Sequence, residues 1–142
     1  MPWYRLLLFL HLASVIVGMG TAVFLHLQSI RRSLHWGDVK HIYFFGSLVI
    51  WSALAAASAS GVALLLLHRG TLPDLFFLKL VLVGMLIVDG LVIDRKLRPA
   101  LAQLRDDQTI RDLPPKELAN LYQSGAVSFV GWWGALAISV LS

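Results

Sequence analysis

The stretch FLHLASVIVGMGTAVFLHLQSIRR, residues 9–32, is apolar enough to lie in a lipid bilayer and yet contains two histidines, His11 and His26. Its apolar run is longer than the roughly 7–15 residues of a secretory signal and lacks a small-residue cleavage site, so we expect it to remain as a helix. A hydrocarbon core about 30 Å thick takes about 20 helical residues to cross. The stretch therefore predicts a transmembrane helix that keeps polar side chains inside it.

The composition of the whole chain is that of a membrane protein. Of its 142 residues, 58% are hydrophobic and 14% are charged, which is too apolar for an ordinary soluble domain. The chain has no cysteine, so disulfides and thiolate metal sites are excluded. The net charge of +4 comes from short segments beside apolar runs, which favours contact with lipid headgroups and argues against nucleic acid as a partner.

Four apolar segments predict an all-α, antiparallel four-helix bundle that forms one integral membrane domain over residues 1–142. The predicted helices span residues 4–30, 41–67, 72–93 and 118–141. The second connection is so short that the helices beside it must be antiparallel neighbours. Residues 94–117 form the predicted cytoplasmic loop, in which Asp112 or Leu113 caps the last helix ahead of two prolines.

Basic residues lie mainly on one side of the predicted membrane. The first and third connections contain Arg31, Arg32, Lys40, Arg95, Lys96, Arg98, Arg105, Arg111 and Lys116. The opposite side contains Arg5 and Arg69. Because positive charge stays in the cytoplasm, both termini should face the outer side of what we expect to be a bacterial inner membrane. The aromatic residues predicted to lie in the interfacial belts are Trp3, Tyr4, Trp36 and Tyr43.

Antiparallel threading at about 1.5 Å per residue sorts the intramembrane polar side chains into two layers. The outer layer contains His11, His68 and Lys79, and the inner layer contains His26, His41 and Asp89. Helical periodicity places His11 on a stripe of small residues that should face the interior of the bundle.

Two interpretations of the charged residues remain open. Lys79 either extends its ammonium to the outer headgroups or faces the interior. Asp89 either has a chemical role or holds the bundle together by pairing with Arg31, His26 or His41.

The histidines are equally open to interpretation. Each fits a hydrogen-bonded interior or interfacial residue, but neutral imidazole is also a good ligand for haem iron, copper or zinc. No two histidines have a close helical spacing, so a site would be assembled across helices from His11 with His68, or from His26 with His41.

Two of the predicted helices are similar to a known membrane family. His11-Leu-Ala-Ser-Val-Ile-Val-Gly-Met-Gly-Thr-Ala-Val-Phe-Leu resembles the first core helix of the HemJ-like protoporphyrinogen oxidases and the related CopD-like copper-resistance domains. Phe77-Leu-Lys79-Leu-Val-Leu-Val resembles their later helix. The resemblance implies a small helical bundle in which His11 binds haem b or a metal, with Lys79 close to the same site.

These patterns predict three alternative functions. The first is a haem b-binding membrane redox protein, or a subunit of a redox complex, in which His11 and His68 ligate the iron and Lys79 pairs with a propionate or assists proton transfer. In that protein a second inner site or proton relay would be formed by His26, His41 and Asp89. The second is a non-enzymatic subunit of a larger respiratory or photosynthetic complex that holds lipid or quinone, and quinone and porphyrin are the candidate small-molecule partners of the chain. The third is a CopD-like copper protein. The expected partners are membrane lipids and either copies of this chain or other subunits.

Overall fold

The computed structural model describes residues 2–31, 33–68 and 75–141. Its long helices are α1 (Pro2–Ile30), α2 (Trp36–Leu67), α3 (Phe76–Val92) and α5 (Pro115–Leu141). Three short elements join α3 to α5: the π-helical turn η1 (Ile93–Leu97), α4 (Arg98–Ala102) and the 3₁₀ turn η2 (Ile110–Asp112). No described residue lies in a strand, so the predicted all-α class is confirmed for these parts of the chain.

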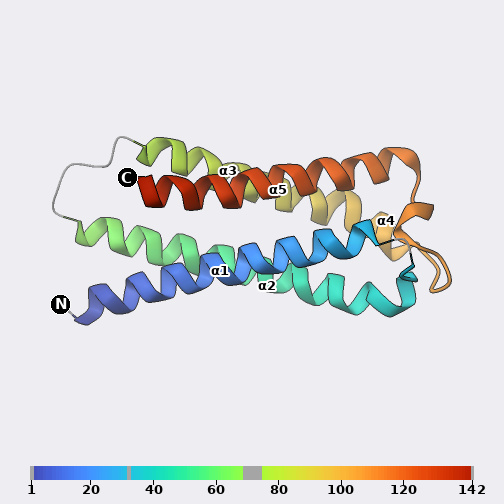
Figure 1. Ribbon diagram of the computed structural model, residues 1–142, viewed down its shortest axis with the longest axis horizontal. Coiled ribbons are helices and arrows are strands. Elements are labelled where there is room, and N and C mark those ends of the chain that lie inside the picture. The colour runs from blue at the N-terminus through green and yellow to red at the C-terminus, as the bar shows by residue number, and fades with distance from the viewer. Residues whose placement is uncertain (1, 32, 69–74, 142) are drawn as a thin grey trace.

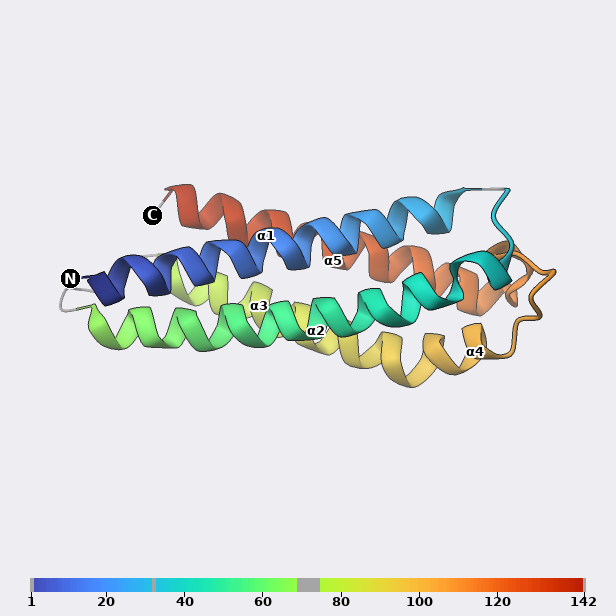
Figure 2. The same ribbon diagram turned by 90° about the horizontal axis from the view of Figure 1, so that it is seen from below.

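The long helices lie side by side, and each runs in the opposite direction to the one before it (Figure 1). α1 packs along α2, α3 packs along α5, and the two pairs meet through α1 and α5. The backbones of α2 and α3 hardly approach each other over the described residues. Both termini lie at one end of the molecule, and we call the opposite end, where α4 and the 103–114 loop lie, the loop end (Figures 1 and 2).

Three helical segments are long and apolar enough to cross a membrane, judged by length and composition: α1, α2 and the continuous segment Phe76–Ala102. The fourth predicted span, in α5, does not meet the same criterion over the described residues. The first turns of α5 contain Lys116, Glu117 and Gln123, and these polar residues shorten its apolar part.

Large apolar side chains cover the outside of the molecule. Phe9, Phe45 and Phe77 are 67%, 68% and 70% exposed. Buried positions, in contrast, include the polar residues Ser29, Ser60, Asp89 and Ser124. Extended apolar surface of this kind is rare on soluble monomers and is expected where lipid is the solvent.

The helix boundaries differ from the predicted ones at both ends of the long loop. Residues 94–102 are helical, because α3 continues through η1 into α4, and α5 begins at Pro115. The charged residues Asp94 and Arg98 suggest a loop in the sequence, but they form an i,i+4 ion pair of 3.7 Å on the helix surface. α2 also begins earlier than predicted, at Trp36. The predicted connection after His68 and the predicted helix start at residue 72 lie outside the described residues.

The loop of residues 103–114 folds over the start of α2. The Trp36 N–H donates to the Gln108 carbonyl at 2.6 Å, and the Lys40 ammonium pairs with the Asp106 carboxylate at 2.7 Å. Ile110 and Leu113 of the loop pack into one buried cluster with Trp36, which is 2% exposed. The prediction that Trp36 and Tyr43 lie in an interfacial belt is therefore wrong, since both side chains are buried in this cluster.

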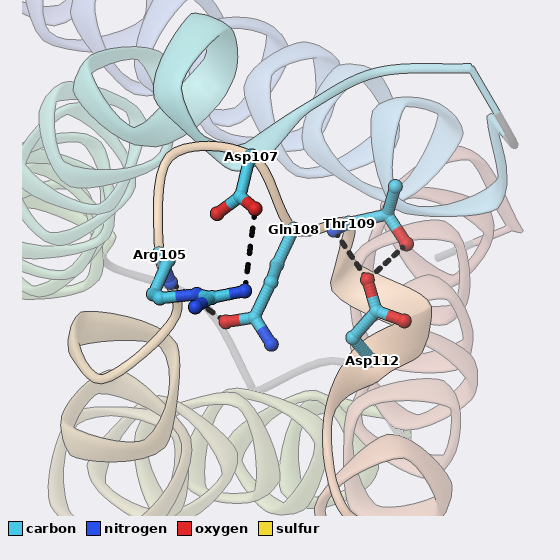
Figure 3. Close-up of polar contacts among 5 residues, drawn as sticks. All are labelled: Arg105, Asp107, Gln108, Thr109 and Asp112. Carbon is cyan, nitrogen blue, oxygen red and sulfur yellow. Dashed lines mark hydrogen bonds and ion pairs between the residues drawn. The ribbon is translucent and has the colours of Figure 1, made fainter.

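Asp112 stabilises the loop instead of capping α5. Its Oδ2 accepts hydrogen bonds from the Thr109 N–H at 2.7 Å and the Thr109 hydroxyl at 3.1 Å (Figure 3). The neighbouring turn is closed by Arg105, whose guanidinium pairs with Asp107 at 3.2 Å (Figure 3). The backbone and hydroxyl hydrogen bonds from Thr109 lower the pKa of the Asp112 carboxyl.

We expect this turn to lose its Asp112 contacts only in acid. Because the folded-state pKa is depressed, the stabilisation is present above the unfolded-state pKa of about 3.9 and is lost as the pH falls through the folded-state value. NMR titration should place the pKa of Asp112 below the ordinary aspartate value of about 3.9, and Thr109→Val should raise it by removing the hydroxyl donor. An ordinary pKa for Asp112 would contradict the hydrogen-bonded turn.

Close packing of α1 on α5 generates a second prediction. A Cβ at Gly18 would lie 2.5 Å from Cη2 of Trp132, whereas a Cβ at Gly20 would meet nothing within 4 Å. Gly18→Ala should therefore destabilise the folded protein by about 1–3 kcal/mol through overpacking. Gly20→Ala, the matched control, should be neutral or slightly stabilising, because alanine favours helix over glycine. Thermal unfolding in detergent measures both, and equal melting temperatures for the two variants would show that the α1–α5 contact is looser than described.

Candidate functional site

His11 faces α2 in the half of the molecule that contains the termini. Its imidazole is half-buried, and Nδ1 lies 2.9 Å from the Ala57 carbonyl oxygen and 3.2 Å from Ser60 Oγ. A carbonyl oxygen only accepts, so Nδ1 carries the proton that is donated to Ala57. A Cβ at Gly61 would lie 3.2 Å from His11 Cε1, so the missing side chain of Gly61 makes room for the ring. Nε2 has no hydrogen-bond partner among the described residues and is the nitrogen available to a ligand.

The other residues of the predicted outer layer lie at the end of α2 and on α3. His68 is the exposed C-cap residue of α2, seven residues after Gly61 and therefore about 10 Å farther along the helix. The Lys79 ammonium donates to Ser139 Oγ at 2.7 Å and so links α3 to α5. The structure therefore places the Lys79 ammonium at Ser139 and His68 nearer the end of α2.

Asp89 forms a second link between α3 and α5. Its carboxylate is buried and accepts a hydrogen bond from Ser124 Oγ at 2.9 Å. The predicted pairing of Asp89 with Arg31, His26 or His41 is not seen, since no ion pair involves Asp89 within the described residues. The buried hydroxyl of Ser124 provides the polar contact that an intramembrane carboxyl requires.

The structure separates the two histidines of the predicted inner layer. The His26 ring packs directly on Gly125 of α5, where a Cβ would overlap it. The imidazole of His26 has no hydrogen-bond partner among the described residues, and it lines a cavity between the helices. His41 is exposed on α2 and is not part of that cavity.

The cavity lies in the loop-end half of the molecule and has a volume of about 140 Å³. All four long helices contribute to it, together with η1 and α4, and most of its walls are apolar side chains. Its polar side chains are His26, Ser29, Tyr43, Ser47, Trp51, Asp94, Arg98, Ser124 and Ser128. Of these, the Tyr43 hydroxyl donates to the Leu25 carbonyl at 3.0 Å, so it is already engaged within the protein.

One group of contacts crosses from α2 to the end of α3 beside the cavity. The Trp51 indole N–H donates to Asp94 Oδ2 at 2.8 Å, and the Trp51 ring packs on Gly90. Asp94 also pairs with Arg98, whose guanidinium carbon lies 5.3 Å from the centre of the Phe44 ring. Sequence reasoning missed this group because Asp94 and Arg98 were assigned to a loop. Their i,i+4 spacing at the end of an apolar run was the available signal.

The side chains that could act as metal ligands limit which metals and cofactors the described residues can bind. They contain no group of three or more His, Asp or Glu side chains that could hold a metal ion. A cofactor that needs only one or two ligands from the protein is compatible with these residues, because the free Nε2 of His11 can supply one ligand. No family model, curated protein or solved structure matches this chain.

The His11 geometry predicts its tautomer. In neutral His11, Nδ1 should carry the proton, because that nitrogen faces the Ala57 carbonyl. ¹⁵N NMR of histidine-labelled protein should show a protonated Nδ1 and an unprotonated Nε2 at position 11, with His11→Gln used to assign the signals. Exposed His35 serves as the control, because its imidazole forms no hydrogen bond with any described residue. A proton on Nε2 of His11 would contradict the bond to Ala57.

Proposed function

We propose that the chain is an integral membrane four-helix bundle with both termini on the outer side of a bacterial inner membrane. The exposed apolar side chains on the long helices and the basic residues near the loop end support this orientation. α5 would complete the bundle as the fourth span, with its polar first turns in the headgroup region. In this arrangement the loop of residues 103–114 lies on the cytoplasmic side.

We further propose that this bundle binds haem b through His11 and serves as a membrane redox protein or as a subunit of a redox complex. The observation that best supports this proposal is the hydrogen bond from His11 Nδ1 to the Ala57 carbonyl. Histidines that bind metals commonly donate their other ring nitrogen to such a carbonyl, which fixes the tautomer and orients the ligand nitrogen. His11 would thus hold a haem iron through Nε2, with its ring already oriented by Ala57.

Haem requires fewer ligands from the protein than a copper ion does. The porphyrin ring supplies four nitrogen ligands, so one or two imidazoles complete the site. A copper ion held by the protein alone needs a cluster of donors, and the described residues contain none with three or more members. For these reasons we place copper second.

Other residues are assigned around His11. His68, on the same side of the predicted membrane, is the proposed second ligand. Lys79 is the proposed partner of a propionate, since its only described side-chain contact is the neutral hydroxyl of Ser139 and an anionic group would neutralise its charge. When bound, haem would supply one-electron chemistry, and the protein would contribute ligation, orientation and an apolar surrounding. Asp89 hydrogen-bonds Ser124 and is assigned a positioning role between α3 and α5.

Absorption spectroscopy tests haem binding. Protein purified in detergent from cells supplied with haem precursors should show b-type bands that sharpen on reduction with dithionite. His11→Ala should abolish these bands. His35→Ala, which removes an exposed histidine outside the bundle, should leave them unchanged.

Two results would replace this proposal. A folded wild-type protein with no haem band but with stoichiometric copper by metal analysis would favour the CopD-like alternative. A folded protein with neither haem nor metal would favour a non-enzymatic subunit of a larger complex.

A further inference from the structure

We infer that the loop-end cavity binds the ring of a lipid-soluble monocyclic quinone, which enters from the bilayer between α2 and α3. This site is separate from His11, and the inference does not depend on haem binding. It rests on the size of the cavity, its unpaired polar groups and its position between α2 and α3, whose backbones hardly approach each other.

The volume of the cavity selects a small ring. An engineered protein cavity of about 150 Å³ binds one benzene molecule. The cavity described here, at about 140 Å³, therefore matches a single six-membered ring and is far too small for a porphyrin. Its apolar walls would contact the faces of the ring, and its polar side chains would contact the edges.

Two polar side chains are available to a ligand inside the cavity. The His26 imidazole and the Ser128 hydroxyl line the cavity, and neither side chain has a hydrogen-bond partner among the described residues. Both can donate a hydrogen bond, which is what a quinone carbonyl accepts. The other polar side chains nearby already have partners, since Ser124 donates to Asp89 and Trp51 donates to Asp94.

The ligand would enter the cavity between α2 and α3, along the line where the two helices face each other, which we call the seam. These two helices have almost no backbone contact over the described residues, whereas the other neighbouring helices pack closely. Side chains close the seam at the cavity, through the Trp51–Asp94 hydrogen bond and through Arg98 against Phe44. Arg98 is the one exposed residue among those that line the cavity, so the opening lies beside it. An alkyl tail could leave through this seam into lipid while the ring stays inside.

A quinone explains these features better than a lipid acyl chain does. An acyl chain offers no acceptor to His26 or Ser128, and desolvating those groups without a partner costs free energy. A quinone ring offers a carbonyl oxygen as acceptor to these two groups, since His26 packs on Gly125, one turn before Ser128 on α5, and the rest of the ring fills the apolar space.

The test is equilibrium binding of 2-decyl-1,4-benzoquinone, whose ring carries no other substituent, to the purified full chain in detergent, followed by quenching of tryptophan fluorescence. We expect saturable quenching, and decanol, which carries the tail without the ring, should not displace the probe. A naphthoquinone with the same decyl tail should bind more weakly, because its second ring exceeds the cavity. Displacement by decanol, or tighter binding of the naphthoquinone, would overturn the inference.

Variants separate the cavity from nonspecific partition into the micelle. Ser128→Leu fills the cavity and should raise the Kd at least about tenfold. Ser52→Leu makes the same change at an exposed position of α2 outside the cavity and should leave the Kd unchanged. If Ser128→Leu does not fold, Ser128→Ala and His26→Leu keep the space and each remove one donor, with an expected rise in Kd of about 3- to 10-fold. Folded Ser128 and His26 variants that bind like the wild type would refute the site.

Discussion

Contacts between glycines and aromatic rings link each long helix of this protein to its neighbours. Four glycines on four different helices each accept a ring from a neighbouring helix, and the pairs are Gly18 with Trp132, Gly61 with His11, Gly90 with Trp51 and Gly125 with His26. In lipid there is no hydrophobic force to drive helices together, so close van der Waals packing of this kind has to hold them. Two of the four rings are histidines that belong to the candidate sites. The same contacts that assemble the bundle therefore position its chemistry.

Hydrogen bonds between the helices follow from this packing. Lys79 and Asp89 lie on α3, and each finds a serine on α5, at Ser139 and Ser124. A charged or buried polar group in lipid is costly unless the protein supplies a partner, and small serines supply one without separating the backbones. α3 and α5 consequently form one tight pair, and α1 and α2 form the other. The seam between α2 and α3 is left with side-chain contacts only, which is why the cavity lies beside it.

The two halves of the molecule have different proposed roles as a result. In the half near the termini, a backbone carbonyl of α2 fixes the His11 ring and leaves one nitrogen for a cofactor. In the loop-end half, the folded loop buries Trp36 and closes the end of the bundle below the cavity. A redox cofactor near one surface and a quinone ring near the other would together permit electron transfer across the membrane.

The sequence by itself determined the helical class and the apolar character of the long helices, because hydropathy and 3.6-residue periodicity are properties of each segment alone. It also identified His11 as an inward residue, since small residues share its stripe. Only the tertiary structure decided which residues of different helices contact each other. Which serine meets Asp89, which carbonyl meets His11 and which ring fills the space above Gly125 depend on the relative depth and rotation of separate helices. Asp94 shows the same limit of sequence analysis. A charged residue at the end of an apolar run predicts a loop, and only the tertiary structure shows that Trp51 of another helix donates a hydrogen bond to it.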